Sequence, residues 1–348
     1  MVRATGRRRE IDEILNSVRS SQKKGRCFHP DAGDTNCTGG PIRSHTLQKE
    51  GALRAIAEDG KVFSVNRGDI AKNHGQIVPA LVGIGNASTF PGFCYSHDAM
   101  FGPAEQKAVP LNQEVAFLLS YRAVAYETFL KEAALESLRR QRVEADERRP
   151  FVEQVRIQQM LHDMTFGTEL GLKDLLRSKE KYDVSYRASY RGFKSLVAEF
   201  SAVLPVVACG SFSPEFNLFG KKLQSLGEAT YPQQIAVNLT VLNERSVLLL
   251  GWMDSDNFAE AFASSYSRLP SSEKANAAVR LAIECCENSH VRPSWWNALS
   301  PTLKDGLLAS FFTMSAPPLC QRGANGFCID GEVFASGSVI REVSWPPG

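Results

Sequence analysis

The chain has 348 residues, of which 43% are hydrophobic and 22% charged, and these proportions are typical of a soluble globular protein. They exclude a disordered, a collagen-like and a coiled-coil chain. The formal net charge is +2, from 40 basic and 38 acidic residues, and does not by itself indicate a polyanionic partner. Eight cysteines are too few for a disulfide scaffold in a chain of this length, so their positions matter more than their number.

The sequence shows no signal for membrane insertion or export. No stretch approaches the roughly 18 consecutive apolar residues that a membrane span needs, and the N-terminus lacks the apolar run of a signal peptide. We therefore expect a cytoplasmic protein with reduced thiols and no membrane contact. Cysteines in that compartment are metal ligands, catalytic groups or core residues more often than disulfide partners.

Residues 1–25 contain seven basic and three acidic side chains. Ile11, Ile14, Leu15 and Val18 recur at helical spacing, which predicts a short amphipathic helix. Two interpretations stay open for its net charge of +4 (7 − 3). The helix contacts nucleic-acid phosphates, or it is a solvated basic helix docked on the next segment.

Residues 26–106 are rich in glycine, cysteine and histidine, and no long helix is predicted in them. They hold only short β-like runs, at Lys61–Val65 and Ile77–Ile84. A small, loop-rich segment with many metal-binding side chains is typical of a module that is organised by a metal ion.

Residues 107–200 are predicted to be helical, and Pro150 is expected to break or kink the helical pattern. The expected helices are Asn112–Arg149, Phe151–Met164 and Ser189–Phe200.

Residues 201–348 combine strands and helices. The runs LPVVACGSF, QQIAVNLTVL and SVLLLGWM are apolar and bounded by turn residues, and the last two predict an antiparallel hairpin joined near Asn243–Glu244. The tail from Pro317 onward is predicted to be irregular. The expected helices are Asp256–Leu269, Ser272–Asn288 and Ser300–Phe312. The whole chain is therefore expected to be α+β, with a zinc module, a helical middle region and a C-terminal mixed domain built on a small antiparallel sheet.

Four side chains form the main candidate site, namely Cys27, Cys37, Cys94 and His97. Cys94 and His97 stand three residues apart, so on a helical turn both side chains lie on one face and can share a metal ion. With the distant cysteine pair they make a Cys₃His set, and thiolate and imidazole ligands in a tetrahedron favour Zn²⁺. His29 stays open as a replacement for Cys27 or Cys37.

The order of these ligands resembles a treble-clef zinc module, and the runs PIRSHTLQ and FCYSHD resemble the HNH branch of the ββα-metal nucleases. The resemblance covers only residues 26–106. It implies a structural zinc, with His97 as a ligand, and hydrolysis of a phosphodiester in DNA or RNA. His45 would be the general base and Asp98 the ligand of a catalytic Mg²⁺ or Mn²⁺.

Two positions depart from the pattern of that family. Its final histidine is replaced by Asp98, and its middle asparagine has no clear equivalent among Asn86, Asn66 and Asn73. The segment also looks like one found in uncharacterised bacterial proteins, some of which are suspected to act in defence against phage.

Other interpretations of the same residues stay open. His45 is either a base or an ordinary hydrogen-bonded histidine, and Asp98 either binds a metal, caps a helix or supports a ligand. Glu105 either completes a metal site or is a surface carboxylate. The leading hypothesis is thus an HNH-like nuclease. Its competitors are a non-catalytic zinc-stabilised protein that binds a protein or nucleic-acid partner, and an enzyme whose site lies wholly in residues 200–348.

Overall fold

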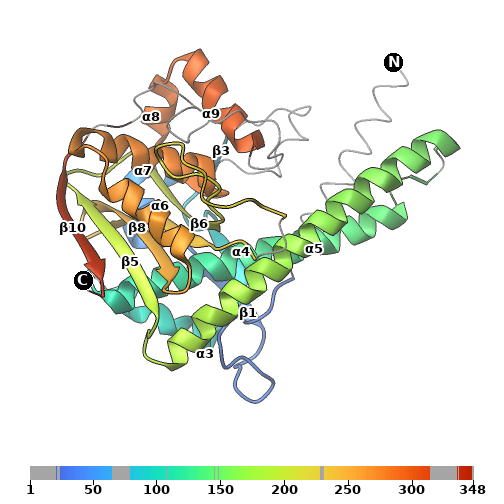
Figure 1. Ribbon diagram of the computed structural model, residues 1–348, viewed down its shortest axis with the longest axis horizontal. Coiled ribbons are helices and arrows are strands. Elements are labelled where there is room, and N and C mark those ends of the chain that lie inside the picture. Colours follow the sequence, from blue (N-terminus) through green and yellow to red (C-terminus); the bar gives the residue numbers. More distant parts are fainter. Residues whose placement is uncertain are drawn as a thin grey trace.

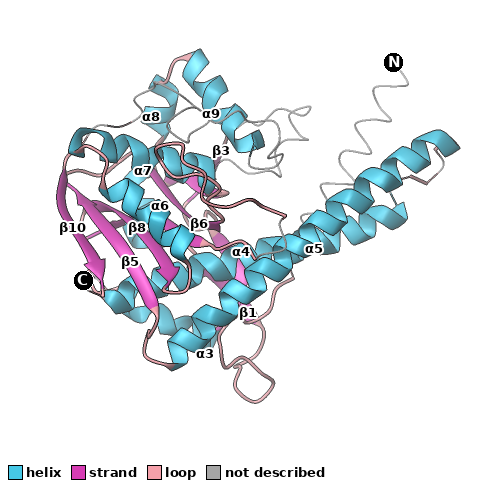
Figure 2. Ribbon diagram, viewed as in Figure 1, coloured by secondary structure: helices cyan, strands magenta, loops and turns pink. Residues whose placement is uncertain are grey.

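A computed structural model gives the fold of the chain (Figures 1 and 2). It combines helices with antiparallel sheets, so the expected α+β class is confirmed. The predicted N-terminal helix falls almost entirely outside the described residues. These are residues 21, 24–64, 79–106, 108–144, 146–147, 149–227, 231–313, 335 and 337–346.

The larger sheet has eight strands in the order β10-β5-β8-β7-β6-β9-β2-β3, and every neighbouring pair is antiparallel. It is larger than the small sheet that the sequence predicted, because β2 and β3 come from residues 26–106 and β10 comes from the tail. The strands are β2 (Lys61–Ser64), β3 (Ala80–Gly83), β5 (Phe193–Phe200), β6 (Val206–Phe212), β7 (Ile235–Leu242), β8 (Arg245–Met253), β9 (Asn288–Val291) and β10 (Val339–Trp345).

Helices cover both faces of this sheet. Four of them match the predicted helices closely, at α4, α6, α7 and α9, whereas α5 runs far beyond its predicted end. Within the described residues, no helix combines the length and the apolar character that crossing a bilayer would require. The helical elements are η1 (Lys49–Leu53), α2 (Arg54–Ile56), α3 (Tyr95–Asp98), η3 (Ala99–Ala104), α4 (Gln113–Glu144), α5 (Phe151–Arg187), α6 (Asn257–Ser267), α7 (Ser271–Cys285), α8 (Pro293–Ala298) and α9 (Pro301–Thr313).

Strand β7 shows that the central strands are covered on both faces. All eight of its residues are buried. Ala236 and Val241 pack in the cluster that includes α4, whereas Val237 and Leu239 pack in the cluster that includes α6 and α7. The strand is therefore covered on both faces, and its two polar residues, Asn238 and Thr240, are buried with the rest.

Helix α4 is the central element of the molecule. Nearly every residue from Val115 to Phe129 is buried, because the sheet packs on one side of the helix, and η3 and the strand β4 (Thr89–Cys94) of a separate two-stranded sheet pack on the other. Toward its C-terminal end, α4 pairs with α5 in an arm that projects from the body (Figure 1).

The predicted helix at Ser189–Phe200 is wrong. Helix α5 continues to Arg187, and a tight turn follows in which Ser189, Tyr190 and Gly192 have φ values of 54°, 67° and 77°. Strand β5 then begins at Phe193. Its sequence FKSLVAEF is buried on both faces, so it lacks the two-residue alternation by which a half-exposed strand is recognised.

The tail is only partly irregular. Residues 314–334 lie outside the described part of the chain, but Val339–Trp345 form β10 and pair with β5. Strand β10 lies at the edge of the sheet, where a strand can carry charged side chains. The charged residues in VIREVSW weaken its apolar pattern, so the sequence did not predict a strand here.

The close approach of α4 to β8 at Gly251 gives a stability prediction. A Cβ at this position would lie 2.1 Å from Ser120 Oγ and 3.0 Å from the Phe193 ring, and both of those side chains are fully buried. Gly251→Ala should therefore lower the free energy of unfolding by about 1–3 kcal/mol, as overpacked cores do. Urea unfolding followed by circular dichroism measures this change.

Gly167→Ala is the matched control. A Cβ at Gly167 on the exposed face of α5 meets nothing within 4 Å, so this change should stabilise the protein by about 0.5–1 kcal/mol. Equal effects of the two substitutions would contradict the proposed contact.

Candidate functional site

Two strands and a short helix carry most of the candidate residues. Strand β1 (Pro41–His45) pairs antiparallel with β4 (Thr89–Cys94), so that His45 lies opposite Thr89 and Pro41 lies opposite Cys94. Helix α3 follows β4 without a loop. This order places Cys94 at the last position of a strand and His97 on the first turn of the next helix.

The ligand atoms of Cys27, Cys37, Cys94 and His97 all lie within 4.8 Å of one another. The Sγ atoms of the three cysteines are 3.4, 3.6 and 3.3 Å from Nδ1 of His97. Bond lengths of about 2.3 Å to sulfur and 2.1 Å to nitrogen place these atoms about 3.6 Å apart in a tetrahedron. The four residues predicted from their spacing therefore form a Cys₃His cluster of the size that a zinc ion requires.

Helices α4 and α5 hold the loop that carries Cys27 and Cys37. The Phe28 backbone N–H donates to the Gly92 carbonyl over 2.8 Å, which ties the loop to β4. The Tyr121 hydroxyl on α4 contacts the Phe28 carbonyl at 2.6 Å. Arg187 at the end of α5 pairs with Asp31 at 3.0 Å. The loop has no regular secondary structure of its own, so these contacts set the position of the two cysteines.

The surroundings of the cluster favour a thiolate at Cys94. Burial raises the pKa of this thiol, but hydrogen bonds from the Ser96 hydroxyl and from the backbone N–H groups of His97 and Thr38 outweigh burial and lower the pKa to about 5. Burial raises the pKa of Cys27 to about 11. Since a bound metal ion deprotonates its thiol ligands, metal binding by Cys27 would release a proton, as is usual for such sites.

His29 is not part of the cluster. Its ring stacks on that of His97, with centroids 3.9 Å apart and planes 4° from parallel, and its Nδ1 accepts the Asp31 backbone N–H over 3.1 Å. Burial, together with the neighbouring His97, lowers the pKa of His29 to about 4. The neutral ring therefore packs against the ligand His97.

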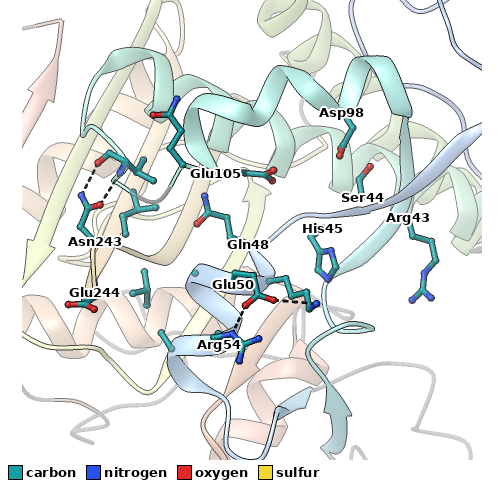
Figure 3. A pocket seen from close by; sticks show the side chains of 17 residues that line it. Arg43, Ser44, His45, Gln48, Glu50, Arg54, Asp98, Glu105, Asn243 and Glu244 are labelled. Carbon is teal, nitrogen blue, oxygen red and sulfur yellow. Dashed lines mark hydrogen bonds and ion pairs between the residues drawn. The ribbon is translucent and has the colours of Figure 1, made fainter.

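A cavity of about 720 Å³ lies beside the cluster, and both His45 and Asp98 line it (Figure 3). Its walls come from β1, the turn after β1, η1, and the end of α3. The hairpin between β7 and β8 forms a further wall, where Asn243 is held by Val109. The Val109 N–H donates to Asn243 Oδ1 over 2.9 Å, and Asn243 Nδ2 donates to the Val109 carbonyl over 2.8 Å. The C-terminal sheet therefore closes a site that the sequence placed within residues 26–106.

The single contact described for the His45 ring fixes its tautomer. Nε2 lies 3.2 Å from the Ile84 carbonyl oxygen. A carbonyl only accepts, so the proton is on Nε2 and Nδ1 carries the lone pair. Burial lowers the pKa of His45, and the positive charges of Lys49 and Arg122 lower it further, whereas the Ile84 contact and Glu105 oppose them. The ring is therefore neutral at neutral pH, with Nδ1 able to accept a proton.

Of the four acidic residues that line this cavity (Glu50, Asp98, Glu105 and Glu244), Asp98 and Glu105 are the candidates for metal binding. Asp98 Oδ1 is buried and has no hydrogen-bond partner among the described residues. Glu105 accepts a hydrogen bond of 2.6 Å from Arg122 Nη2, and this guanidinium lies 3.8 Å from the centre of the Phe101 ring. Arg122 is only 1% exposed, so a buried cation on α4 orients Glu105. Figure 3 shows Glu105 and Asp98 extending toward a common space.

The structure thus brings His45, Asp98 and Glu105 together. Asn86 does not line the cavity, and its side chain instead accepts a hydrogen bond of 3.1 Å from Arg43. Asn66 and Asn73 lie outside the described residues.

Sequence reasoning missed Ser44, Gln48 and Asn243, which also line the cavity. Ser44 and Gln48 lie within three residues of the candidate base His45 in the sequence, and this proximity could have identified them. Asn243 carried none, because its partner is 134 residues away.

Comparison of the chain with protein-family models, with curated proteins and with solved structures finds no match.

The Cys₃His geometry predicts about one zinc ion per chain in the purified protein. Elemental mass spectrometry should find this zinc in wild type and lose it in Cys94→Ser, because three ligands hold zinc far more weakly than four. Cys285→Ser is the matched control, since Cys285 is outside the cluster and should leave the zinc content unchanged. Folded wild-type protein without zinc would refute the site.

Proposed function

We propose that the protein is a metal-dependent nuclease of the HNH type, which hydrolyses phosphodiester bonds in DNA or RNA. The observation that carries this proposal is the single cavity that His45 and Asp98 share beside the Cys₃His cluster. The antiparallel pair β1 and β4, followed at once by α3, supports the treble-clef order of strand, strand and helix. Residues that are 53 positions apart in the sequence, His45 and Asp98, thus supply the base and the carboxylate of the proposed site.

In the proposed reaction, Nδ1 of His45 accepts a proton from a water molecule as the water oxygen attacks phosphorus. A new P–O bond forms, the P–O bond to the leaving sugar oxygen breaks, and that oxygen takes a proton from solvent. The Ile84 carbonyl holds the Nε2 proton of His45, so the ring stays in the tautomer in which Nδ1 is the base.

The donor set of the cavity fits a hard divalent cation. Asp98 offers a buried carboxylate oxygen without a partner among the described residues, and Glu105 retains one oxygen that Arg122 does not hold. Carboxylate oxygens are the ligands that Mg²⁺ and Mn²⁺ prefer. Such an ion would stabilise the negative charge that develops on the phosphate. The zinc ion of the Cys₃His cluster would then be purely structural.

The second candidate is a non-catalytic, zinc-stabilised binding protein. The observation that favours it is the position of Asn86, whose side chain is bonded to Arg43 and does not line the cavity. Asn86 therefore does not supply the asparagine that the nuclease family uses, and the amide of the asparagine that does line the cavity, Asn243, is bonded to the Val109 backbone. On this view, Arg43, Lys49 and Arg54 would bind an anionic partner at the cavity without hydrolysing it.

His45→Ala separates the two candidates. Loss of a general base lowers the rate about 10²- to 10⁴-fold, so cleavage of single- or double-stranded nucleic acid with Mg²⁺ or Mn²⁺ should fall by that factor. Zinc content and melting temperature should stay unchanged, and the exposed His162 of α5 gives the matched control, His162→Ala. Wild-type protein that binds nucleic acid but never cleaves it would favour the binding protein.

The lowered pKa of His45 also predicts a pH profile. The base works in its neutral form, and the shift keeps His45 neutral below the ordinary histidine value of 6.5. kcat/KM for cleavage should therefore be flat around neutral pH and should fall in acid, with a midpoint below 6.5. Zinc content must be measured over the same range, because acid also protonates the thiolate ligands. A midpoint above the ordinary value, at constant zinc content, would contradict the assigned base.

A further inference from the structure

Two buried side chains in the wall of the cavity each have a polar atom that makes no hydrogen bond within the described residues. Ser44 is 2% exposed and Gln48 is 9% exposed, and both line the cavity. Ser44 Oγ and Gln48 Nε2 have no hydrogen-bond partner within the described part of the chain. Such atoms are rare in native proteins because each loses its bonds to water on folding. With Asp98 Oδ1, three such atoms belong to residues that line one cavity, which indicates a polar ligand.

The chemistry of Ser44 Oγ and Gln48 Nε2 favours a ligand that accepts hydrogen bonds. The side-chain amide nitrogen of glutamine only donates hydrogen bonds, and a serine hydroxyl donates one. Three basic residues line the cavity with four acidic ones, and two of the basic residues, Lys49 and Arg54, pair with Glu50. The positive charge available to a ligand is therefore that of Arg43. The described side-chain partners of Arg43 are the neutral Asn86 and Thr89, so these contacts leave its charge uncompensated. The ligand of this part of the cavity is therefore expected to present oxygens that accept hydrogen bonds and carry negative charge.

The local backbone makes room for Gln48. A Cβ on Gly51 would lie 2.5 Å from Gln48 Oε1, so the glycine lets the amide lie against the start of η1. Ser44 is the residue before His45 on β1, and Figure 3 shows its hydroxyl pointing toward Asp98. Ser44 is thus adjacent to the proposed base in sequence, and both donor residues line the cavity that Asp98 and Glu105 also line.

We propose that Ser44 Oγ and Gln48 Nε2 form a phosphate subsite in this cavity, which holds the non-bridging oxygens of the phosphate group that His45 and Asp98 act on. The proposal deepens the proposed function, because it names the side chains that would bind the substrate's phosphate. The reaction at this subsite depends on the proposed nuclease function, whereas the binding of phosphate does not. Phosphate oxygens would accept the hydrogen bonds that Ser44 Oγ and Gln48 Nε2 can donate, whereas a cation offers no acceptor to the Gln48 amide nitrogen.

Titration calorimetry with sodium phosphate tests the subsite, with sodium chloride matching the ionic strength and no divalent ion added. Wild type should bind phosphate saturably. Ser44→Ala and Gln48→Glu should each weaken this binding about tenfold or more, since hydrogen bonds to charged groups are among the stronger ones. Gln48→Glu keeps the shape of the side chain but replaces a donor by a like charge.

Three further variants serve as controls. Gly51→Ala leaves both donor residues in place but displaces the Gln48 side chain, and should also weaken phosphate binding. Ser264→Ala and Gln159→Ala change exposed residues on α6 and α5 and should bind as wild type does. Zinc content and melting temperature show that every variant is folded.

The outcomes test the phosphate subsite and the proposed nuclease function separately. Wild type that binds no phosphate, or variants at Ser44 and Gln48 that bind it as wild type does, would overturn the subsite even if His45→Ala abolishes cleavage. Phosphate binding that depends on both residues, in a protein that never cleaves nucleic acid, would leave the subsite in place and remove the nuclease.

Discussion

The molecule depends on one helix that is buried on all sides along its first half. Helix α4 packs on the sheet so closely that Gly251 has no space for a side chain. On its other side, Tyr121 contacts the backbone of the loop that carries Cys27 and Cys37, and Arg122 holds Glu105. A buried hydroxyl and a buried guanidinium are costly unless they find partners. These polar contacts therefore fix the Cys₃His cluster and the cavity relative to the sheet.

A shared apolar core supports this arrangement. Phe28, Phe93 and Phe101 from the segment that carries the Cys₃His cluster belong to the same cluster of buried side chains as α4 and the inner face of β8, including Leu249. The segment that carries the cysteines is thus built into the main core. An ion bound by the Cys₃His cluster would order a loop whose surroundings are already fixed.

The sequence was sufficient where the signal was local. Two predictions that depend on neighbouring residues alone were correct. One is that Cys94 and His97 lie close together, and the other is the hairpin turn at Asn243–Glu244. The hairpin turn is also locally specified, since asparagine tolerates the φ of 50° that residue 243 adopts. The sequence failed where tertiary contacts decide. Strand β5 lacks alternation because both of its faces are covered, and nothing near Asn243 indicates that its side chain reaches Val109.

The wall that the β7–β8 hairpin contributes has a consequence for biosynthesis. All four ligands of the Cys₃His cluster lie within the first 97 residues, whereas Asn243 and the strands that carry it are made much later. On the ribosome, the ligands are complete well before the cavity can be closed. A nascent or truncated chain that ends before β7 holds the cysteines and His97, together with His45 and Asp98, but lacks the wall beside them. The order of translation therefore delays a complete site until most of the protein has been made.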